Sequence, residues 1–365
     1  MRIGILGTRG VPNYHGGFEQ FAEFFSVYLA KQGHEVSVYN SSCHPYQNKN
    51  FKGVNIIHCY DPEDKIGTAG QFIYDLKCIL DARKRGFDVL LQLGYTSSTV
   101  WYKLLPKKAL IITNMDGLEW KRSKYSKPVQ RFLKFAEKLA VISSDYLIAD
   151  SIGIQNYLKN TYNINSEYIA YGAEIFNTPN QHILSEYNLE PYSYNMLIAR
   201  LEPENNIETI LDGVASSNNK TPFIVVGKHD VNAFGAYLKN KFKHQPHIHF
   251  VGGIYNLEHL NNLRYYSNLY FHGHSVGGTN PSLLEAMSSR ALIIANDNEF
   301  NKTILKENAF YFKTVDDVKN YLETVLKADH QDKLDNCNNQ IIKYFNWNLI
   351  NKKYLDFFNA CISEH

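Results

Sequence analysis

The sequence predicts an α/β protein built from two doubly wound halves. Short apolar runs rich in branched residues alternate with longer amphipathic segments, as they do in parallel βα units. The 365 residues suffice for two domains, each with its own core. The alternation is interrupted at residues 169–179, where a polar stretch follows. We therefore expect Rossmann-like domains at 1–172 and 173–345.

The apolar runs predict the strands of each half. In the first half, strands are expected at Arg2–Gly7, Glu35–Tyr39, Val54–His58, Asp88–Leu93, Ala109–Thr113 and Tyr146–Asp150. In the second half, they are expected at Asn195–Ala199, Phe223–Gly227, His249–Gly252, Asn268–His272 and Leu292–Ala295. Amphipathic periodicity predicts helices between them, for example at Phe18–Gln32 before Gly33.

Composition rules out several classes of protein. Hydrophobic residues make up 44% of the chain, which excludes a disordered protein. The five cysteines are odd in number and widely spaced, so neither a disulfide framework nor a zinc site is indicated. The apolar run Met1–Gly7 is too short for a signal peptide, and no run approaches the roughly 18 residues of a membrane span. We expect a cytoplasmic protein.

The net charge of +2 hides an uneven distribution. Residues 1–172 carry 21 Lys and Arg against 15 Asp and Glu, whereas the remainder is acidic. Between Lys103 and Lys138, ten basic residues face three acidic ones and alternate with aromatic residues. This composition is typical of a surface that rests on anionic lipid, although a solvated basic helix face would have the same composition. The stretch contains no nucleic-acid-binding module, so no nucleic-acid partner is expected.

A glycine-rich turn after the first strand suggests an anion site in the first half. Gly4, Gly7 and Gly10 lack the spacing of a dinucleotide site. Gly16 and Gly17, in contrast, lead directly into a helix, whose free N–H groups attract phosphate. A plain flexible loop before a helix remains the alternative.

A second anion site is predicted in the other half. Asn280 is a good N-cap and Pro281 suits the first helical position, so unpaired N–H groups point back toward Gly277, Gly278 and Thr279. Two such helix ends would suit a diphosphate.

Charged side chains near this helix have both functional and structural interpretations. Glu285 would accept hydrogen bonds from a ribose diol or lie on the exposed helix face. Arg200 and Lys228, each at the carboxyl end of a strand, would bind phosphate oxygens or form surface salt bridges. His274 would act in catalysis or simply pack or cap.

At this point the sequence resembles a known family. The segments Ala199–Glu204, Gly277–Met287 and Tyr344–Trp347 resemble those of the GT-B retaining glycosyltransferases of family four. The segments Gly7–Pro12, Gly16–Glu19 and Asp116–Arg122 are similar to those of rhamnosyltransferases for bacterial surface polysaccharides. The resemblance implies two domains facing a central cleft, with residues 346–365 packing back onto the first.

The resemblance also implies roles for single residues. Gly16 and Gly17 would approach the donor diphosphate, Arg200 would bind phosphate, and Glu285 would hold the donor ribose. Glu19, Asp116 and Glu119 are expected to bind the acceptor. Asp116 would orient or deprotonate the acceptor hydroxyl, or else only form a turn with Gly117.

Two positions depart from the family pattern. Gly277 replaces the first glutamate of a Glu-seven-residues-Glu motif, so Gly278, Thr279 or His274 would have to contact the transferred sugar. Asn205 and Asn206 stand where most members carry a lysine, and Lys228 is the candidate substitute.

The expected activity is retaining transfer of a hexose or deoxyhexose, with rhamnose favoured, from a nucleotide diphosphate sugar. The acceptor would be a lipid-linked saccharide at the inner face of the membrane, contacted through Lys103–Lys138. The chain has no D-x-D pair, so no metal or other cofactor is expected. A GT-B sugar-nucleotide epimerase and a non-catalytic nucleotide-sugar-binding protein remain the alternatives.

Overall fold

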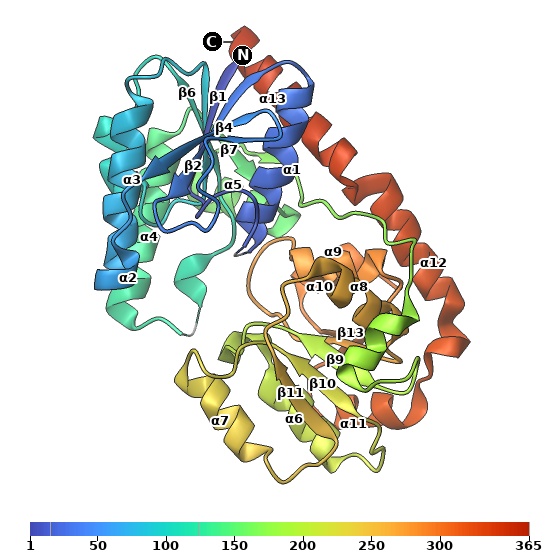
Figure 1. Ribbon diagram of the computed structural model, residues 1–365. Helices are drawn as coiled ribbons and strands as arrows, with labels where there is room; N and C mark the ends of the chain where they lie inside the picture. The colour runs from blue at the N-terminus through green and yellow to red at the C-terminus, as the bar shows by residue number, and fades with distance from the viewer. Residues whose placement is uncertain (15, 123, 365) are drawn as a thin grey trace. The chain divides into compact units, whose positions relative to one another are not determined.

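A computed structural model of the protein describes residues 1–14, 16–122 and 124–364. These residues form two α/β units (Figure 1). Unit 1 contains Met1–Trp120, Ser126–Tyr171 and Trp347–His365, and unit 2 contains Lys121–Tyr125 and Gly172–Asn346. The two parallel-sheet units confirm the predicted fold class. The grouping of Lys121–Tyr125 with unit 2 was not predicted from the sequence.

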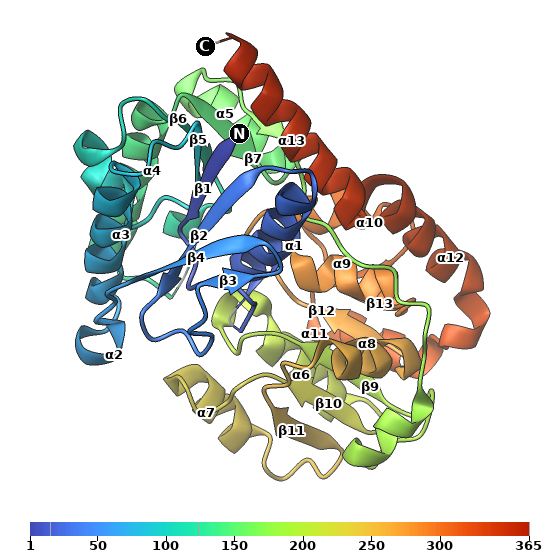
Figure 2. The same cartoon turned by 45° about the horizontal axis from the view of Figure 1, so that its top comes forward.

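The sheet of unit 1 is parallel except at one edge. In spatial order its strands are β3 (Asn50–Phe51), β4 (Val54–Cys59), β2 (Glu35–Ser41), β1 (Arg2–Leu6), β5 (Val89–Leu93), β6 (Leu110–Asn114), β7 (Tyr146–Ala149) and β8 (Glu167–Tyr168). Only β3 pairs antiparallel, with β4, at the edge seen in Figure 2. Strand order reverses between the neighbours β1 and β5.

Helices cover both faces of this sheet. They are α1 (Gly17–Lys31), α2 (Glu63–Ile66), α3 (Ala69–Ala82), α4 (Lys127–Ser143), α5 (Ile152–Tyr162) and α13 (Trp347–Glu364). Short 3-10 helices occur at Thr99–Leu104 and Glu119–Lys121. Figure 1 shows α1 and α13 on the side of the sheet opposite to α3 and α4.

Unit 2 repeats the same plan with six parallel strands. Their order is β11 (Ile248–Gly252), β10 (Phe223–Val226), β9 (Asn195–Ile198), β12 (Tyr270–His272), β13 (Ile293–Asn296) and β14 (Phe310–Phe312). The helices are α6 (Ile207–Ser216), α7 (Ala233–Lys241), α8 (Leu257–Tyr266), α9 (Pro281–Ser288), α10 (Glu299–Leu305), α11 (Val315–Thr324) and α12 (Gln331–Gln340). Short 3-10 turns at Gln181–Tyr187, Pro203–Asn205 and Lys327–His330 and a π-helix at Ile341–Phe345 complete the unit.

Every strand that the sequence predicts is present, with ends shifted by no more than two residues. The prediction missed β3, β8 and β14, which are edge strands of only two or three residues. Runs this short carry no readable alternation. The predicted N-cap is confirmed, since Asn280 Oδ1 accepts a hydrogen bond from the Ser282 amide at 2.9 Å.

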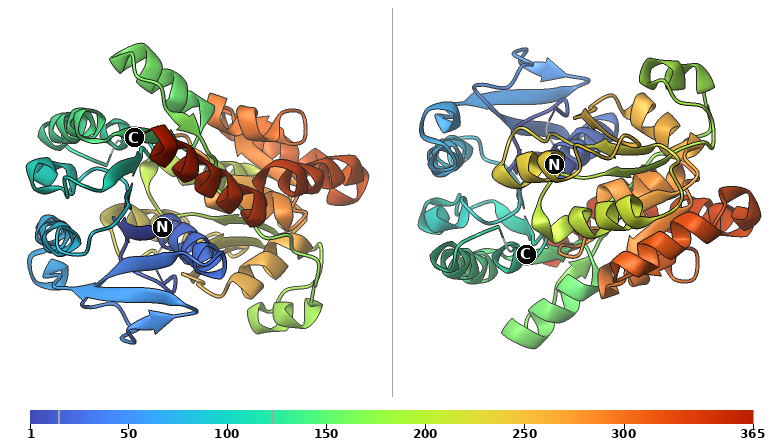
Figure 3. Two further views of the ribbon diagram at one scale, coloured as in Figure 1. Left: turned by 90° about the horizontal axis from the view of Figure 1, so that it is seen from above. Right: turned by 90° about the horizontal axis from the view of Figure 1, so that it is seen from below.

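Aromatic side chains attach α13 to unit 1, where it runs beside α1 (Figure 3). Trp347 stacks on Phe24 with ring centres 4.7 Å apart, and Phe25 meets the Phe358 ring edge-on at 5.6 Å. The buried Tyr354 hydroxyl accepts a hydrogen bond from Asn114 Nδ2 at 2.8 Å. The last helix is therefore part of the core of unit 1.

We expect Phe358→Ala to destabilise unit 1 by about 3–5 kcal/mol, because a fully buried ring is replaced by a cavity. Urea unfolding followed by tyrosine and tryptophan fluorescence measures the change. Phe357→Ala, which removes the half-buried neighbouring ring, serves as the control with a smaller loss. Equal losses in both variants would contradict this account of α13.

Candidate functional site

The loops after β9 and β12 meet at the point where the strand order of unit 2 reverses. Ser275 Oγ donates to the Glu204 carbonyl at 2.7 Å, and Asn206 Nδ2 donates to the Gly273 carbonyl at 2.8 Å. A Cβ on Gly273 would lie 2.0 Å from the Asn205 carbonyl oxygen, so only glycine fits. Ligands of open parallel sheets bind at such a reversal, beyond the carboxyl ends of the strands.

Arg200 lies in the first of these loops with a fixed backbone and an exposed side chain. Its carbonyl accepts hydrogen bonds from the Glu202 amide and from Asn205 Nδ2, both at 2.8 Å. Its guanidinium has no hydrogen bond or ion pair with any described residue. The structure therefore presents five N–H donors for an anionic ligand.

Two asparagines, Asn205 and Asn206, brace this loop. Asn205 bonds to the Arg200 carbonyl, and Asn206 links the loop to Gly273. Neither supplies a positive charge. Lys228, which follows β10 next to β9, is exposed, with its Nζ 5.3 Å from the centre of the Tyr255 ring.

Helix α9 begins at Pro281 and directs its amino end toward residues 277–280. Gly277 has a φ of +134°, and a Cβ placed there would meet no atom within 4 Å. A side chain would have room, but the backbone conformation disfavours any residue except glycine. Thr279, which follows Gly277 and Gly278, is buried.

Glu285 is neither isolated nor mainly exposed, which corrects one interpretation of the sequence. Its Oε2 accepts a hydrogen bond from Arg264 at 2.7 Å, and 16% of its side chain is exposed. Arg264 is 1% exposed and lies on α8. The sequence analysis missed this arginine, because only the packing of α8 against α9 brings it to Glu285.

Two histidines stack at the end of β12. The rings of His272 and His274 are 4.5 Å apart and nearly parallel, and within the described chain neither nitrogen of His272 has a partner. Burial, with the charges of Arg200 and Arg122, lowers the pKa of His274 to about 3. Both imidazoles are therefore neutral near pH 7, which leaves His274 as a neutral hydrogen-bonding group.

The segment Lys121–Tyr125 adds positive charge to unit 2. Arg122 lies 3.9 Å from the largely buried carboxylate of Glu204, and Lys124 lies 4.0 Å from Glu202. Both acidic residues belong to the loop that carries Arg200. Both basic residues lie in the stretch predicted to face lipid, and in the structure their charged groups lie near the acidic side chains of this loop.

In unit 1, the residues predicted to bind ligands surround the carboxyl ends of β1 and β6. Gly16 is exposed just before α1, and His15 beside it lies outside the described residues. Glu19 is 8% exposed and accepts a hydrogen bond from the Arg9 amide at 2.8 Å, so it braces the loop after β1.

Asp116 follows β6 and is half-buried. Its neighbour Gly117 has a φ of +58°, which a turn at this place requires. The charge of Asp116 contributes, after burial, to raising the pKa of Tyr171. Glu119 is half-buried in the 3-10 turn that follows.

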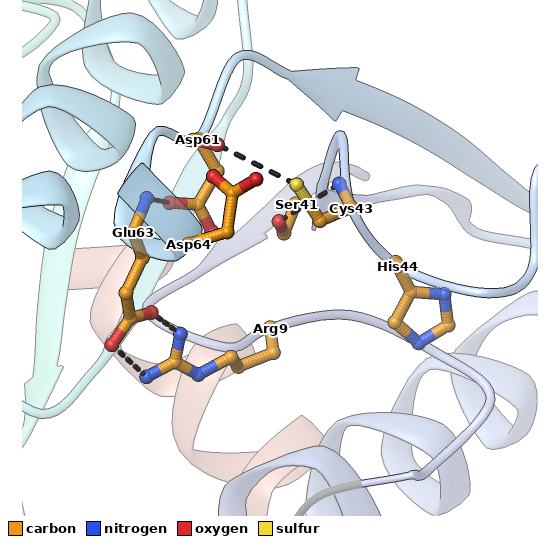
Figure 4. Close-up of a pocket in the computed structure, with 7 residues that line it drawn as sticks. All are labelled: Arg9, Ser41, Cys43, His44, Asp61, Glu63 and Asp64. Atoms are coloured by element: carbon orange, nitrogen blue, oxygen red, sulfur yellow. Dashed lines mark hydrogen bonds and ion pairs between the residues drawn. The ribbon is translucent and has the colours of Figure 1, made fainter. Parts of the chain in front are cut away.

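Unit 1 also has a pocket of about 190 Å³ that the sequence did not indicate. Its lining residues follow β1, β2 and β4 and are Arg9, Ser41, Cys43, His44, Asp61, Glu63 and Asp64. Figure 4 shows the Arg9 guanidinium turned toward the Glu63 carboxylate, to which it donates at 2.9 Å. Burial lowers the pKa of His44, so acidic groups dominate the charge of this pocket.

A buried carboxyl group lies on α3 of the same unit. Asp75 is 5% exposed and accepts a hydrogen bond from Ser97 Oγ at 2.5 Å. Burial raises the pKa of Asp75 to about 7, although the Ser97 hydrogen bond opposes this shift.

Two family models together match most of the chain. Residues 1–174 match a domain of unknown function, DUF1972, and residues 188–344 match the glycosyl transferases of group 1. No curated protein matches the sequence. Among the described residues, no cluster of His, Cys, Asp or Glu side chains could hold a metal ion, and no helix is long and apolar enough to cross a membrane.

Solved structures share the fold at low sequence identity. Sucrose-phosphate synthase from Thermosynechococcus elongatus is 16% identical with a TM-score of 0.79, and the match covers 100% of both chains. Anabaena HepE in complex with UDP-glucose is 14% identical with a TM-score of 0.75, over 98% of this chain and 99% of that one. A glycosyltransferase from Rickettsia africae is 13% identical with a TM-score of 0.71, over 100% and 98%.

The pKa of Asp75 predicts a pH-dependent effect on stability. Between about pH 4 and pH 7 the folded protein keeps a proton that the unfolded chain releases, so wild-type stability falls as the pH rises through this range. Asp75→Asn removes this loss and should be more stable than wild type at pH 8, by at most about 4 kcal/mol. Urea unfolding at pH 5 and pH 8 measures the difference, which should shrink at pH 5.

Asp81 on the same helix provides a control with the opposite sign. Despite its desolvation by burial, Arg85 and Tyr39 lower the pKa of Asp81. Asp81→Asn should therefore be less stable than wild type at pH 8. A stability gain at pH 8 from both substitutions, or from neither, would contradict these assignments.

Proposed function

We propose that the protein, whose residues 188–344 match the group 1 glycosyltransferases, transfers a sugar from a nucleotide diphosphate sugar with retention of anomeric configuration. The observation that supports this proposal most directly is the Arg200 guanidinium, which is exposed and unpaired among the described residues. Its loop meets the segment before α9 where the strand order reverses. HepE, a structure with the same fold, binds UDP-glucose.

The donor diphosphate would lie between positive groups of unit 2. Arg200 supplies a full charge and a fork of donors, and the amino end of α9 adds a partial positive charge. Lys228 replaces the charge that Asn205 and Asn206 lack. These groups would stabilise the charge that develops on the leaving diphosphate, so the proposed reaction uses no metal ion.

The rest of the donor would be held along α9. Glu285 would accept hydrogen bonds from the ribose hydroxyls. The backbone of Gly278 and Thr279 and the neutral His274 would contact the transferred sugar in place of the glutamate missing at Gly277. The depressed pKa of His274 supports a positioning contact rather than proton transfer by this residue.

Unit 1 would bind the acceptor. We assign this role to Glu19, Asp116 and Glu119, with Gly16 and Gly17 reaching the donor diphosphate. Asp116 would orient the acceptor hydroxyl, and a phosphate oxygen of the leaving group would take its proton. The transferred sugar is a hexose or deoxyhexose, with rhamnose favoured by the first-half motifs, and the acceptor is a lipid-linked saccharide.

The outer face of α4 supports a lipid-linked acceptor. Lys127, Arg131 and Lys138 are exposed on one helical stripe with Phe135 and Ile142, whose exposed fractions are 54% and 60%. Basic residues around apolar ones favour an anionic bilayer surface.

One lysine of this helix is held by neighbouring side chains and is only partly exposed. Lys134 Nζ lies over the Trp120 and Tyr157 rings, at 4.5 and 4.6 Å from their centres, and pairs with the buried Glu137 at 2.8 Å. Only the stripe of Lys127, Arg131, Phe135, Lys138 and Ile142 is therefore proposed to touch the membrane.

Arg200→Ala should lower transfer at least a hundredfold without changing thermal stability, since the side chain is exposed and supports no other residue. Release of nucleotide diphosphate from UDP-, GDP- and dTDP-sugars in the presence of a polyprenyl-diphosphate saccharide measures transfer. Lys220→Ala, at the amino end of β10, is the matched control and should keep full activity. Substantial turnover by Arg200→Ala would contradict its role.

The same assay separates the alternative functions. Without acceptor, an epimerase would convert the sugar of the donor, which chromatography of the recovered nucleotide sugar would reveal. A non-catalytic binding protein would bind donor yet release no nucleotide diphosphate even with acceptor present. Either result would replace the proposed activity.

Phe135→Asp combined with Ile142→Asp should reduce binding to phosphatidylglycerol-containing liposomes about tenfold, because the stripe loses apolar area and gains negative charge. Flotation measures the bound fraction. Lys159→Glu, which reverses an exposed charge on α5, is the control and should float like wild type. A wild-type protein without preference for anionic over neutral liposomes would contradict membrane docking by α4.

A further inference from the structure

A buried arginine connects α8 to two successive turns of α9. Arg264 donates from one terminal nitrogen to Ser282 Oγ at 3.1 Å and to Glu285 Oε2 at 2.7 Å. Its other terminal nitrogen donates to Asn261 Oδ1, also on α8, at 3.0 Å. One guanidinium thus touches a residue in the first turn of α9 and a residue in its second turn.

The surroundings of Arg264 hold the guanidinium in a single place. Its carbon lies 5.9 Å from the centre of the buried Tyr270 ring, and the Tyr270 hydroxyl is 3.0 Å from Ser282 Oγ. Ser289 at the end of α9 donates to Asn261 Oδ1 at 3.1 Å. With 1% of the side chain exposed, the guanidinium has no freedom to follow a mobile partner.

Burial of this charge is costly, and stability alone does not account for it. An apolar side chain of similar volume would fill the same space without the cost of removing a guanidinium from water. What the guanidinium adds is direction, because one arm of its fork donates both to Glu285 Oε2 and to Ser282 Oγ and so fixes the position of that carboxylate oxygen. Ser282 and Glu285 lie three residues apart on one helix face, so the same fork also fixes the rotation of α9.

We propose that Arg264 is a positioning residue for nucleotide recognition, which holds the Glu285 carboxylate in the orientation that accepts the ribose hydroxyls. The inference rests on the proposed function, in which Glu285 binds the donor ribose. It adds that ribose recognition depends on a residue that does not itself touch the donor. Loss of Arg264 would leave Glu285 present but without the charged hydrogen bond that directs its Oε2.

The experiment compares ribose with deoxyribose ligands in the full chain. Isothermal titration calorimetry measures the Kd of UDP and of GDP and the Kd of the 2′-deoxy analogue of each. The discrimination ratio is the Kd of the deoxy form divided by the Kd of the ribose form, and a general loss of stability does not alter it. Wild type should prefer the ribose form about tenfold, as expected for one hydrogen bond to a charged group. Glu285→Gln should reduce this ratio to about twofold.

Arg264→Met removes every hydrogen-bond donor of this side chain and should reduce the discrimination ratio as far as Glu285→Gln does. Arg264→Lys keeps one charged donor group and should restore part of the ratio. Ser289→Ala breaks the link to Asn261 without touching Glu285, so this control should keep the wild-type ratio. The same order should hold in steady-state kinetics, with a raised KM for the donor and kcat changed less than threefold.

The outcomes separate the two proposals. The assigned donor site is overturned if the wild-type protein binds neither nucleotide, or if it binds the ribose and deoxyribose forms equally. If the wild-type ratio is as expected, Glu285→Gln lowers it and both Arg264 variants retain it, only the positioning role is overturned. If Arg264→Met fails to fold in a thermal unfolding assay, Arg264→Lys decides, because an unchanged ratio in that folded variant overturns the role.

Discussion

The reversal of strand order between β9 and β12 decides where unit 2 can bind a ligand. Because both strands are parallel and adjacent, the chain leaves them at the same edge and turns away in opposite directions. The loop of Arg200 and the loop before α9 therefore meet, and Gly273 allows their backbones to touch. The positions of the Arg200 guanidinium, the amino end of α9 and the stacked rings of His272 and His274 all depend on this reversal.

Two arginines of unit 2 show how burial assigns different roles to the same side chain. Arg200 is exposed and its guanidinium has no partner among the described residues, whereas Arg264 is enclosed and donates to protein groups from both terminal nitrogens. An exposed guanidinium can neutralise a developing charge, and a buried one can only orient its partners. The proposed donor site uses both, because a carboxylate without a fixed direction would recognise a diol poorly.

Burial also distinguishes the basic residues between Lys103 and Lys138 from one another. By count, the ten basic residues between Lys103 and Lys138 are equivalent, yet the structure separates them. Lys134 contacts aromatic rings and pairs with Glu137, whereas Arg122 belongs to unit 2 and lies beside Glu204 there. The periodicity of α4 leaves Lys127, Arg131 and Lys138 on its outer face, which a count of charges cannot distinguish.

The sequence by itself determined every strand except β3, β8 and β14, the division into two α/β halves, the cap at Asn280 and the position of Arg200 at a strand end. These features follow from local patterns, since apolar periodicity and capping depend on residues close in the chain. Only the tertiary structure decided the partners of Glu285, the stacking of His272 on His274 and the pocket beside Arg9. These depend on contacts between elements far apart in sequence, where burial sets the charge and direction of each side chain.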